Sequence, residues 1–175
     1  MANTFSPIQS VTLGSAAASV TFSGIPQTYT DLVLRVAARA GGSPASSWGF
    51  NLRCNGVSTT LYSVTILTGS GTAASSARLS DTMAYAGDIS SSSATTNTFG
   101  SAEIYLPNYT GSADKPLSSF AAAETNASAS NLRAVAGLAR IAAAINSLTI
   151  IPDGTSPTND FVAGSSFHLY GIKNT

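Results

Sequence analysis

The sequence consists of short segments in which apolar and polar residues alternate, and clusters of Gly, Pro, Asn and Ser bound each segment. The clearest segment runs from Asp31 to Ala40. Its residues fall on two faces, with Leu32, Leu34, Val36 and Ala38 on one and Val33, Arg35, Ala37 and Arg39 on the other. A period of two residues with charge on one face is typical of a half-buried β-strand. The pattern therefore favours an all-β fold.

Further segments of this kind follow at short intervals. They are Ile8 to Leu13, Ser19 to Phe22, Phe50 to Cys54, Leu61 to Leu67, Thr82 to Ala86, Ser101 to Leu106, Ser118 to Glu124, Leu132 to Leu138, Leu148 to Ile151 and Ser166 to Ile172. Asn55-Gly56, directly after one of them, is a strong turn dipeptide. Short strands separated by turn signals predict a single antiparallel β-sandwich that is jelly-roll-like. We expect the sandwich over residues 8–175, after a flexible N-terminal arm over residues 1–7.

Three stretches depart from the alternation. Between residues 132 and 145, apolar residues recur at three- and four-residue spacing and Ala is abundant, which is compatible with a helix. A glycine within this stretch weakens a helix, so we interpret Leu132 to Leu138 as a strand and Arg140 to Ala144 as a turn. Ser70 to Ser80 and Ser90 to Thr98 are low-complexity runs, and we expect both to be exposed loops.

Composition limits the available chemistry. More than half of the residues are Ser, Thr, Ala or Gly, and only eight basic and eight acidic side chains are present. Because Lys and Arg occur singly and the net charge is zero, we expect no nucleic-acid partner. No stretch approaches 18 apolar residues, so we expect no spanning helix and no membrane partner. Weak self-repulsion and small side chains favour association, which indicates a building block before a catalyst.

Metal sites and disulfides have little basis in this sequence. Cys54 is the single cysteine, which rules out an internal disulfide and a multi-cysteine metal site. Asp153-Gly154 with Asn159 and Asp160 is oxygen-rich but lacks EF-hand spacing, so we interpret it as a plain turn. We therefore expect no metal and no cofactor. The N-terminus has neither the basic nor the apolar region of a secretory signal, and we expect synthesis in the cytoplasm.

Few residues could carry catalysis. His168 is the single histidine, and alternation places it beside Tyr170 on one strand face. The chain has no Gly-x-Ser-x-Gly elbow, so we interpret His168 as a hydrogen-bonded sheet residue and not as a triad base. Glu103 and Glu124 would suit glycoside hydrolysis only if held about 5 to 10 Å apart, and salt bridges to Arg are the simpler use. We therefore expect no enzymatic activity.

Three aromatic residues stand out beside small polar ones, namely Trp48, Tyr105 and Tyr109. Aromatic rings in such surroundings stack on sugar rings or anchor protein interfaces. The alternative is that they cap the ends of the sandwich core. From the sequence these three are the candidate interface or glycan-stacking residues.

Three stretches together carry a resemblance to a known group of proteins. They are Gly24-Ile25-Pro26-Gln27-Thr28-Tyr29-Thr30-Asp31-Leu32-Val33-Leu34, Ile104-Tyr105-Leu106-Pro107-Asn108-Tyr109 and Phe161-Val162-Ala163-Gly164-Ser165-Ser166-Phe167-His168-Leu169-Tyr170-Gly171-Ile172. With them, the chain resembles small virion structural proteins of tailed bacteriophages, including phages of cyanobacteria, from about residue 8 to 173. The resemblance implies a jelly-roll-like module used on a virus particle, and it transfers no catalytic residue.

What the resemblance implies is a capsid decoration, or cement, protein on the virion head surface. Such a protein would bind the major capsid protein and itself, as a homotrimer, and tie neighbouring capsid subunits together. A second hypothesis is a tail or fibre module that binds host surface carbohydrate, with Trp48 and the nearby aromatics as its stacking platform. A third is a polysaccharide hydrolase that uses Glu103 or Glu124.

Overall fold

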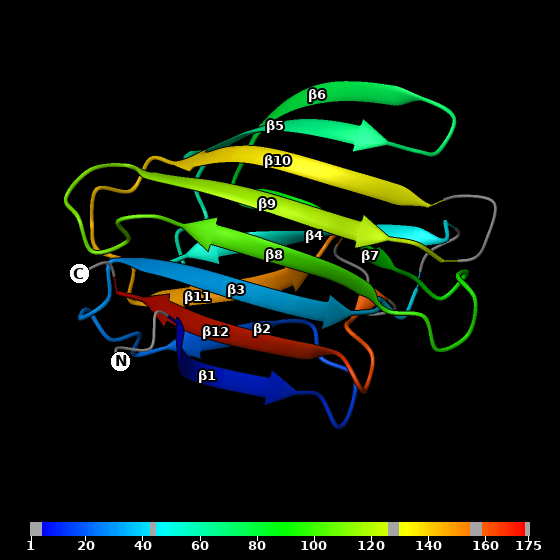
Figure 1. Ribbon diagram of the computed structural model, residues 1–175, viewed down its shortest axis with the longest axis horizontal. Helices are drawn as coiled ribbons and strands as arrows, with labels where there is room; N and C mark the ends of the chain where they lie inside the picture. The colour runs from blue at the N-terminus through cyan, green and yellow to red at the C-terminus, as the bar shows by residue number, and fades with distance from the viewer. Residues whose placement is uncertain (1–4, 43–44, 126–129, 155–158, 174–175) are drawn as a thin grey trace.

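The computed structural model describes residues 5–42, 45–125, 130–154 and 159–173 (Figure 1). Within these residues twelve strands form: β1 (Phe5–Thr12), β2 (Val20–Ser23), β3 (Asp31–Ala38), β4 (Ser47–Cys54), β5 (Tyr62–Gly69), β6 (Ala74–Asp81), β7 (Ala84–Ser90), β8 (Gly100–Leu106), β9 (Lys115–Ala123), β10 (Asn131–Ala139), β11 (Ser147–Pro152) and β12 (Ser166–Ile172). The alternating segments of the sequence are therefore strands.

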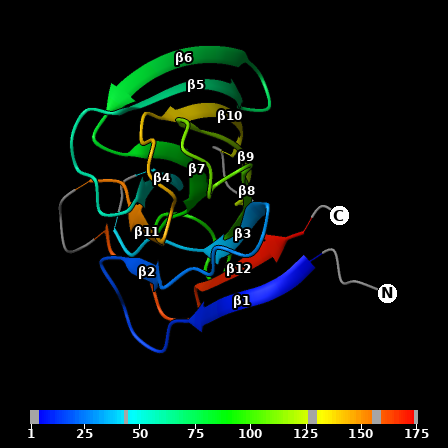
Figure 2. The same ribbon diagram turned by 90° about the vertical axis from the view of Figure 1, so that its left-hand side faces the viewer.

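The strands form two antiparallel sheets that pack face to face (Figures 1 and 2). The larger sheet has the order β1-β12-β3-β8-β9-β10-β5-β6, and the smaller sheet has the order β2-β11-β4-β7. In Figure 2 the smaller sheet lies against one face of the larger sheet, and β5 and β6 extend past its edge strand β7. The predicted all-β sandwich is confirmed, and its jelly-roll-like character stays a prediction.

Alternation along the strands builds one core between the sheets. On β3 the apolar face predicted from the sequence is buried, with Leu32, Leu34 and Ala38 fully so. From the smaller sheet, Phe50 and Leu148 meet them as part of the same core cluster. Each fully buried large apolar side chain stabilises the fold by about 1.5–3 kcal/mol. Among the described residues, no second layer covers the opposite face of the larger sheet.

The two sheets lie close together where β7 packs against β9, and small residues make this approach possible. Gly87 has a φ of 134°, and a Cβ placed on it would lie 2.3 Å from the Cβ of Ala121. Ser119 Oγ donates to the carbonyl oxygen of Ala86 at 2.5 Å across the same interface. The abundance of Ala, Ser and Gly thus has a packing role, because larger side chains here would force the sheets apart.

Two expectations about irregular segments need correction. Ser70 to Ser80 was expected to be a loop, but most of it is strand β6, which pairs with β5 along its whole length and is exposed throughout. Residues 132–145 contain no helix. The expected strand Leu132 to Leu138 is present within β10, which ends at Ala139, whereas the residues up to 144 form an irregular connection and not a regular turn. Backbone pairing with β5 overrides the weak strand propensity of β6.

The second low-complexity run, Ser90 to Thr98, is a loop after Ser90, as expected. Arg39 holds this loop against the sandwich: its guanidinium donates to the carbonyl oxygens of Thr95 at 2.8 Å, Thr98 at 3.0 Å and Ala94 at 3.1 Å. Hydrogen bonds from a charged donor are stronger than those from a neutral donor, so the Arg39 side chain alone fixes the loop over residues 94–98.

The N-terminal boundary differs from the expected arm over residues 1–7. Strand β1 starts at Phe5 and pairs with β12, with Phe5 opposite Ile172 and Pro7 opposite Tyr170. Residues 5–7 therefore belong to the sheet. Pro7 is tolerated because β1 is an edge strand, where a missing N–H donor breaks no ladder on the open side. Residues 1–4 of the expected arm lie outside the described residues.

Asn55 and Gly56 form the tight turn predicted from their sequence. Both have positive φ, 52° and 68°, and the Val57 N–H donates to the Cys54 carbonyl oxygen at 3.0 Å. This is the geometry of a type I′ turn, which favours Asn-Gly. The turn places Cys54 at the end of β4, fully buried, where its N–H donates to the Tyr62 hydroxyl at 3.0 Å.

Burial of Cys54 predicts a loss of stability at alkaline pH. Burial raises the pKa of its thiol from 9.0 to about 12. The folded state therefore retains a proton that the unfolded state releases, so the free energy of unfolding falls as pH rises from about 9 to about 12. The slope is at most about 1.4 kcal/mol per pH unit. Urea unfolding across this range should show a shallower fall for Cys54→Ala, and equal slopes would contradict the prediction.

Candidate interaction surfaces

His168 lies on the outer face of the larger sheet, on β12. Its Nδ1 is 3.0 Å from Ser10 Oγ, and its cross-strand neighbour on β3 is Arg35. A hydroxyl partner and a cationic neighbour do not orient or activate a catalytic base as a carboxylate would. The geometry is that of a hydrogen-bonded sheet histidine.

The two candidate carboxylates are held apart. Glu103 Oε2 accepts from Arg35 Nε at 2.9 Å, and both side chains are about half exposed. Such an exposed pair contributes at most about 1 kcal/mol. The residue opposite Glu103 on β9 is Phe120, and Glu124 follows four residues later, which is about 13 Å along an extended chain. This separation does not suit the two carboxylates of a glycosidase.

The oxygen-rich segment after β11 forms a hydrogen-bonded turn. Asp153 Oδ1 accepts from the Gly154 N–H at 2.9 Å and from Asn51 Nδ2 at 3.4 Å. Asn159 Nδ2 donates to the Asp153 carbonyl oxygen at 3.4 Å. Across the described residues, no three His, Cys, Asp or Glu side chains gather as ligands for a metal ion. Oxygen Oδ1 of the Asp153 carboxylate is therefore used in local hydrogen bonds.

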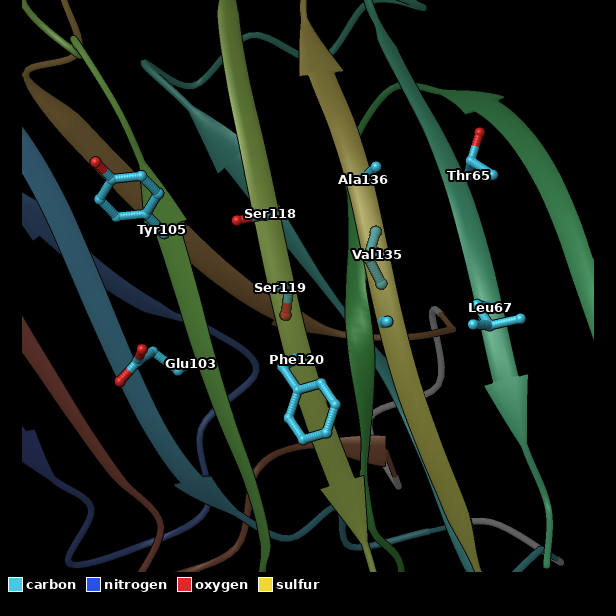
Figure 3. Close-up of a pocket in the computed structure, with 10 residues that line it drawn as sticks. Thr65, Leu67, Glu103, Tyr105, Ser118, Ser119, Phe120, Val135 and Ala136 are labelled. Carbon is cyan, nitrogen blue, oxygen red and sulfur yellow. The ribbon is translucent and has the colours of Figure 1, made fainter.

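The outer face of the larger sheet carries a shallow hollow of about 470 Å³ over β8, β9, β10 and β5 (Figure 3). We call it the outer hollow. It is lined by Thr65, Leu67, Glu103, Tyr105, Ser118, Ser119, Phe120, Ala134, Val135 and Ala136. None of the twelve described strands lies over it in either view of the ribbon (Figures 1 and 2).

Strand register builds the outer hollow from two rows of side chains. The first row runs Glu103, Phe120, Ala134, Leu67 across the four strands, and the second runs Tyr105, Ser118, Ala136, Thr65. Small residues at the centre form a low floor between larger side chains. The hollow therefore results from the alignment of Ala and Ser residues on neighbouring strands. This alignment cannot be recognised from the sequence of any one strand.

Large apolar side chains are exposed in and beside the outer hollow. Phe120 is 55% exposed, Leu67 56% and Leu132, one row further along β10, 45%. Contiguous apolar surface of this kind marks a protein interaction site more often than a solvated face. The outer hollow can therefore exclude water against a partner, although it contains no activated nucleophile or acid–base pair among its lining residues.

Tyr105, one of the aromatic residues singled out from the sequence, lies at the rim of the outer hollow (Figure 3). Its hydroxyl donates to Asp31 Oδ2 at 2.8 Å, and Asp31 Oδ1 also accepts from the Asn108 N–H at 2.8 Å. The hydrogen bond to Asp31 raises the pKa of Tyr105. Asp31, at the start of β3, therefore holds the ring of Tyr105, near the end of β8, in place.

The other two aromatic residues do not join Tyr105 on one platform. Tyr109 is fully buried, and its hydroxyl donates to the Pro26 carbonyl oxygen. It caps the core, which was the alternative interpretation, and it presents no surface to a ligand. Trp48 lies on β4 of the smaller sheet, where its Nε1 donates to the Asp153 carbonyl oxygen at 2.6 Å. A platform made of all three residues is therefore wrong.

A second concavity, which the sequence did not indicate, surrounds Trp48. This groove of about 350 Å³ lies where the edge of the smaller sheet meets β10, and we call it the seam groove. It is lined by Ala45, Ser47, Trp48, Gly49, Tyr85, Asp88, Asn131, Arg133 and Asp153. The residues come from β4 and the loop before it, from β7 and β10, and from the turn after β11, so no sequence motif joins them.

A charged network forms the base of the seam groove. Asp88, only 3% exposed, accepts from Arg133 Nε at 2.9 Å and from Asn131 Nδ2 at 2.8 Å through Oδ2. The Tyr85 hydroxyl donates to Asp88 Oδ1, and burial followed by the Asp88 charge raises the pKa of Tyr85. Arg133 also donates to Thr68 Oγ1. A buried carboxylate with several donors is a rigid part of the structure.

Comparison with known proteins adds no family to this picture. A scan against protein-family models finds no match to the chain, and a search of curated proteins finds none either. The described residues include no helix with the length and apolar character needed to cross a bilayer.

Proposed function

We propose that this protein is a non-enzymatic virion structural protein, a capsid decoration protein on the outer head surface. The observation that carries the proposal is the outer hollow, where Phe120, Leu67 and Leu132 expose large apolar area on a shallow sheet face with few charged side chains. Such a face suits a broad, flat partner more than a small substrate. The proposed partner is the major capsid protein, and each decorating copy ties neighbouring capsid subunits together.

Three further features support a structural role. The larger sheet is continuous from β1 to β6 through antiparallel strand pairing, so backbone hydrogen bonds hold it together across its whole width. Net charge is zero, which reduces repulsion between densely arrayed copies. Of the residues that could support catalysis, Glu103 is engaged in a salt bridge and His168 in a hydroxyl contact.

The proposed oligomer is a homotrimer at three-fold or quasi-three-fold positions of the head. Several modest contacts from one oligomer bind far more tightly than one contact alone, because the second and third form at high effective concentration. The jelly-roll-like topology and synthesis in the host cytoplasm belong to the same proposal.

Cryo-electron microscopy of the virion that carries this chain tests the proposal. We expect density of this sandwich repeated over the head at local three-fold positions, with the outer hollow facing the major capsid protein. Density confined to the tail or its fibres would overturn the decoration role. Native mass spectrometry of capsid-bound material after release should give three times the 17.6 kDa chain mass.

A further inference from the structure

The seam groove has features that the capsid role does not use. It is separate from the outer hollow: the two share no lining residue, and the groove opens at the junction of both sheets. Its volume of about 350 Å³ lies within the range of small-molecule sites, roughly 300–1,000 Å³. The lining residues indicate which class of ligand would bind there.

The aromatic rings of Trp48 and Tyr85 border the groove, and Gly49 leaves the space that the Tyr85 ring occupies. A Cβ on Gly49 would lie 2.8 Å from Tyr85 Cε2 and 3.1 Å from Asp153 Oδ2. Gly49 therefore allows the Tyr85 ring and the Asp153 carboxylate to lie directly over β4. Trp48 and Tyr85 both pack against the core with one side and remain partly exposed with the other. Aromatic faces of this kind attract C–H groups, because their π-systems are negative.

Polar groups at the base are already fixed by one another. Asp88 binds Arg133, Asn131 and Tyr85, and Asn131 Nδ2 also donates to Ser47 Oγ at 2.8 Å. Arg133 has five N–H donors, and its bonds to Asp88 and Thr68 use two of them. A ligand would therefore meet a preorganised set of donors and acceptors, which reduces the entropy lost on binding.

The charged residues of the groove favour a neutral ligand over an anionic one. Asp88 and Asp153 carry two negative charges, and Arg133 carries one positive charge that is paired with Asp88. An anionic ligand would meet a net negative site, whereas a neutral ligand would not be repelled. Hydroxyl groups both donate and accept, so they match the Asp153 carboxylate and the Arg133 guanidinium at the same time.

We infer that the seam groove binds a neutral saccharide of one or two rings, with the C–H face of a pyranose against Trp48 and Tyr85 and its hydroxyls on Asp153 and Arg133. This site differs from the platform suggested by the sequence, because it joins Trp48 to Tyr85 and leaves out Tyr105 and Tyr109. It does not depend on the capsid role, since the outer hollow stays free when the groove is filled.

Tryptophan fluorescence offers a direct test, because Trp48 is the single tryptophan of the chain. The full-length protein would be titrated with neutral disaccharides (maltose, cellobiose, lactose and mannobiose) and with anionic sialyllactose. We expect a saturable change with at least one neutral disaccharide, with a Kd of about 0.1–10 mM. Sialyllactose should bind at least about 10-fold more weakly than lactose, which has the same neutral core.

Two variants test whether the fluorescence change comes from binding in the seam groove. Asp153→Asn keeps an oxygen for the Gly154 N–H and changes an exposed side chain, so we expect an unchanged melting temperature and at least about 10-fold weaker binding by calorimetry. Phe120→Asp, in the outer hollow, should bind the disaccharide like the wild type. Absence of a saturable change with every neutral disaccharide would overturn the inference, and so would tighter binding of sialyllactose or unchanged binding by Asp153→Asn.

Discussion

Phe120→Asp should reduce the affinity of this protein for virus heads by more than about 100-fold while leaving its fold intact. Phe120 is 55% exposed and lies in the first row of the outer hollow, between Glu103 and Ala134. A buried aromatic anchor contributes about 2–4 kcal/mol to an interface, and an aspartate at its place would also lose hydration without a partner. In a trimer the same change weakens three contacts at once, so the loss multiplies.

The measurement is co-sedimentation of the purified protein with heads assembled without it. Leu67 and Leu79 provide a matched pair of controls on one hairpin. Leu67 is 56% exposed in the outer hollow, whereas Leu79 is 44% exposed opposite Val64, on the other face of the sheet. We expect Leu67→Asp to lose binding and Leu79→Asp to retain it. Retention of Phe120→Asp on heads at the wild-type level would show that another surface contacts the capsid.

Strand positions could be predicted from the sequence because alternation is a local property. The ten residues from Asp31 to Ala40 alternate so regularly that both faces of a strand can be recognised from them alone. Strand β3 lies within this segment. Strand β6 could not be predicted this way, because all eight of its residues are exposed and no hydrophobic face is selected. The pairing of strands is not local at all: β3 lies between β12 and β8, which are far from it in the sequence.

The interaction surfaces depend on this non-local pairing. Tyr105 could be proposed as a surface aromatic from its neighbours, but Tyr109, four residues later, has similar neighbours and is buried. The outer hollow forms only when Ala134 aligns with Phe120 and Ala136 with Ser118 across strands. The seam groove depends on Asp88 and Arg133, which are 45 residues apart and carry no motif. Only residues whose surroundings are local could be interpreted correctly from the sequence.

The chain has two lysines, and their surroundings are opposite. Lys115, at the start of β9, is 1% exposed, whereas Lys173 is exposed after β12. The Lys115 ammonium donates to the carbonyl oxygens of Gly111 at 2.6 Å and Ala113, in the loop before β9. It also donates to those of Ile141 at 3.3 Å and Ala142 at 3.4 Å, in the connection after β10. One cation therefore joins two irregular segments at the same end of the sandwich.

Lys115→Met should destabilise the fold by about 3 kcal/mol, because a side chain of similar length fills the space but leaves buried carbonyl oxygens without a donor. For a chain of this size the melting temperature should fall by roughly 6–12 °C. Lys173→Met changes the same residue type on the surface and should shift it by less than about 2 °C. Thermal unfolding followed by circular dichroism compares the two. An unchanged melting temperature for Lys115→Met would mean that the hydrogen bonds of the ammonium only offset the cost of burying its charge, and that packing alone holds the two segments.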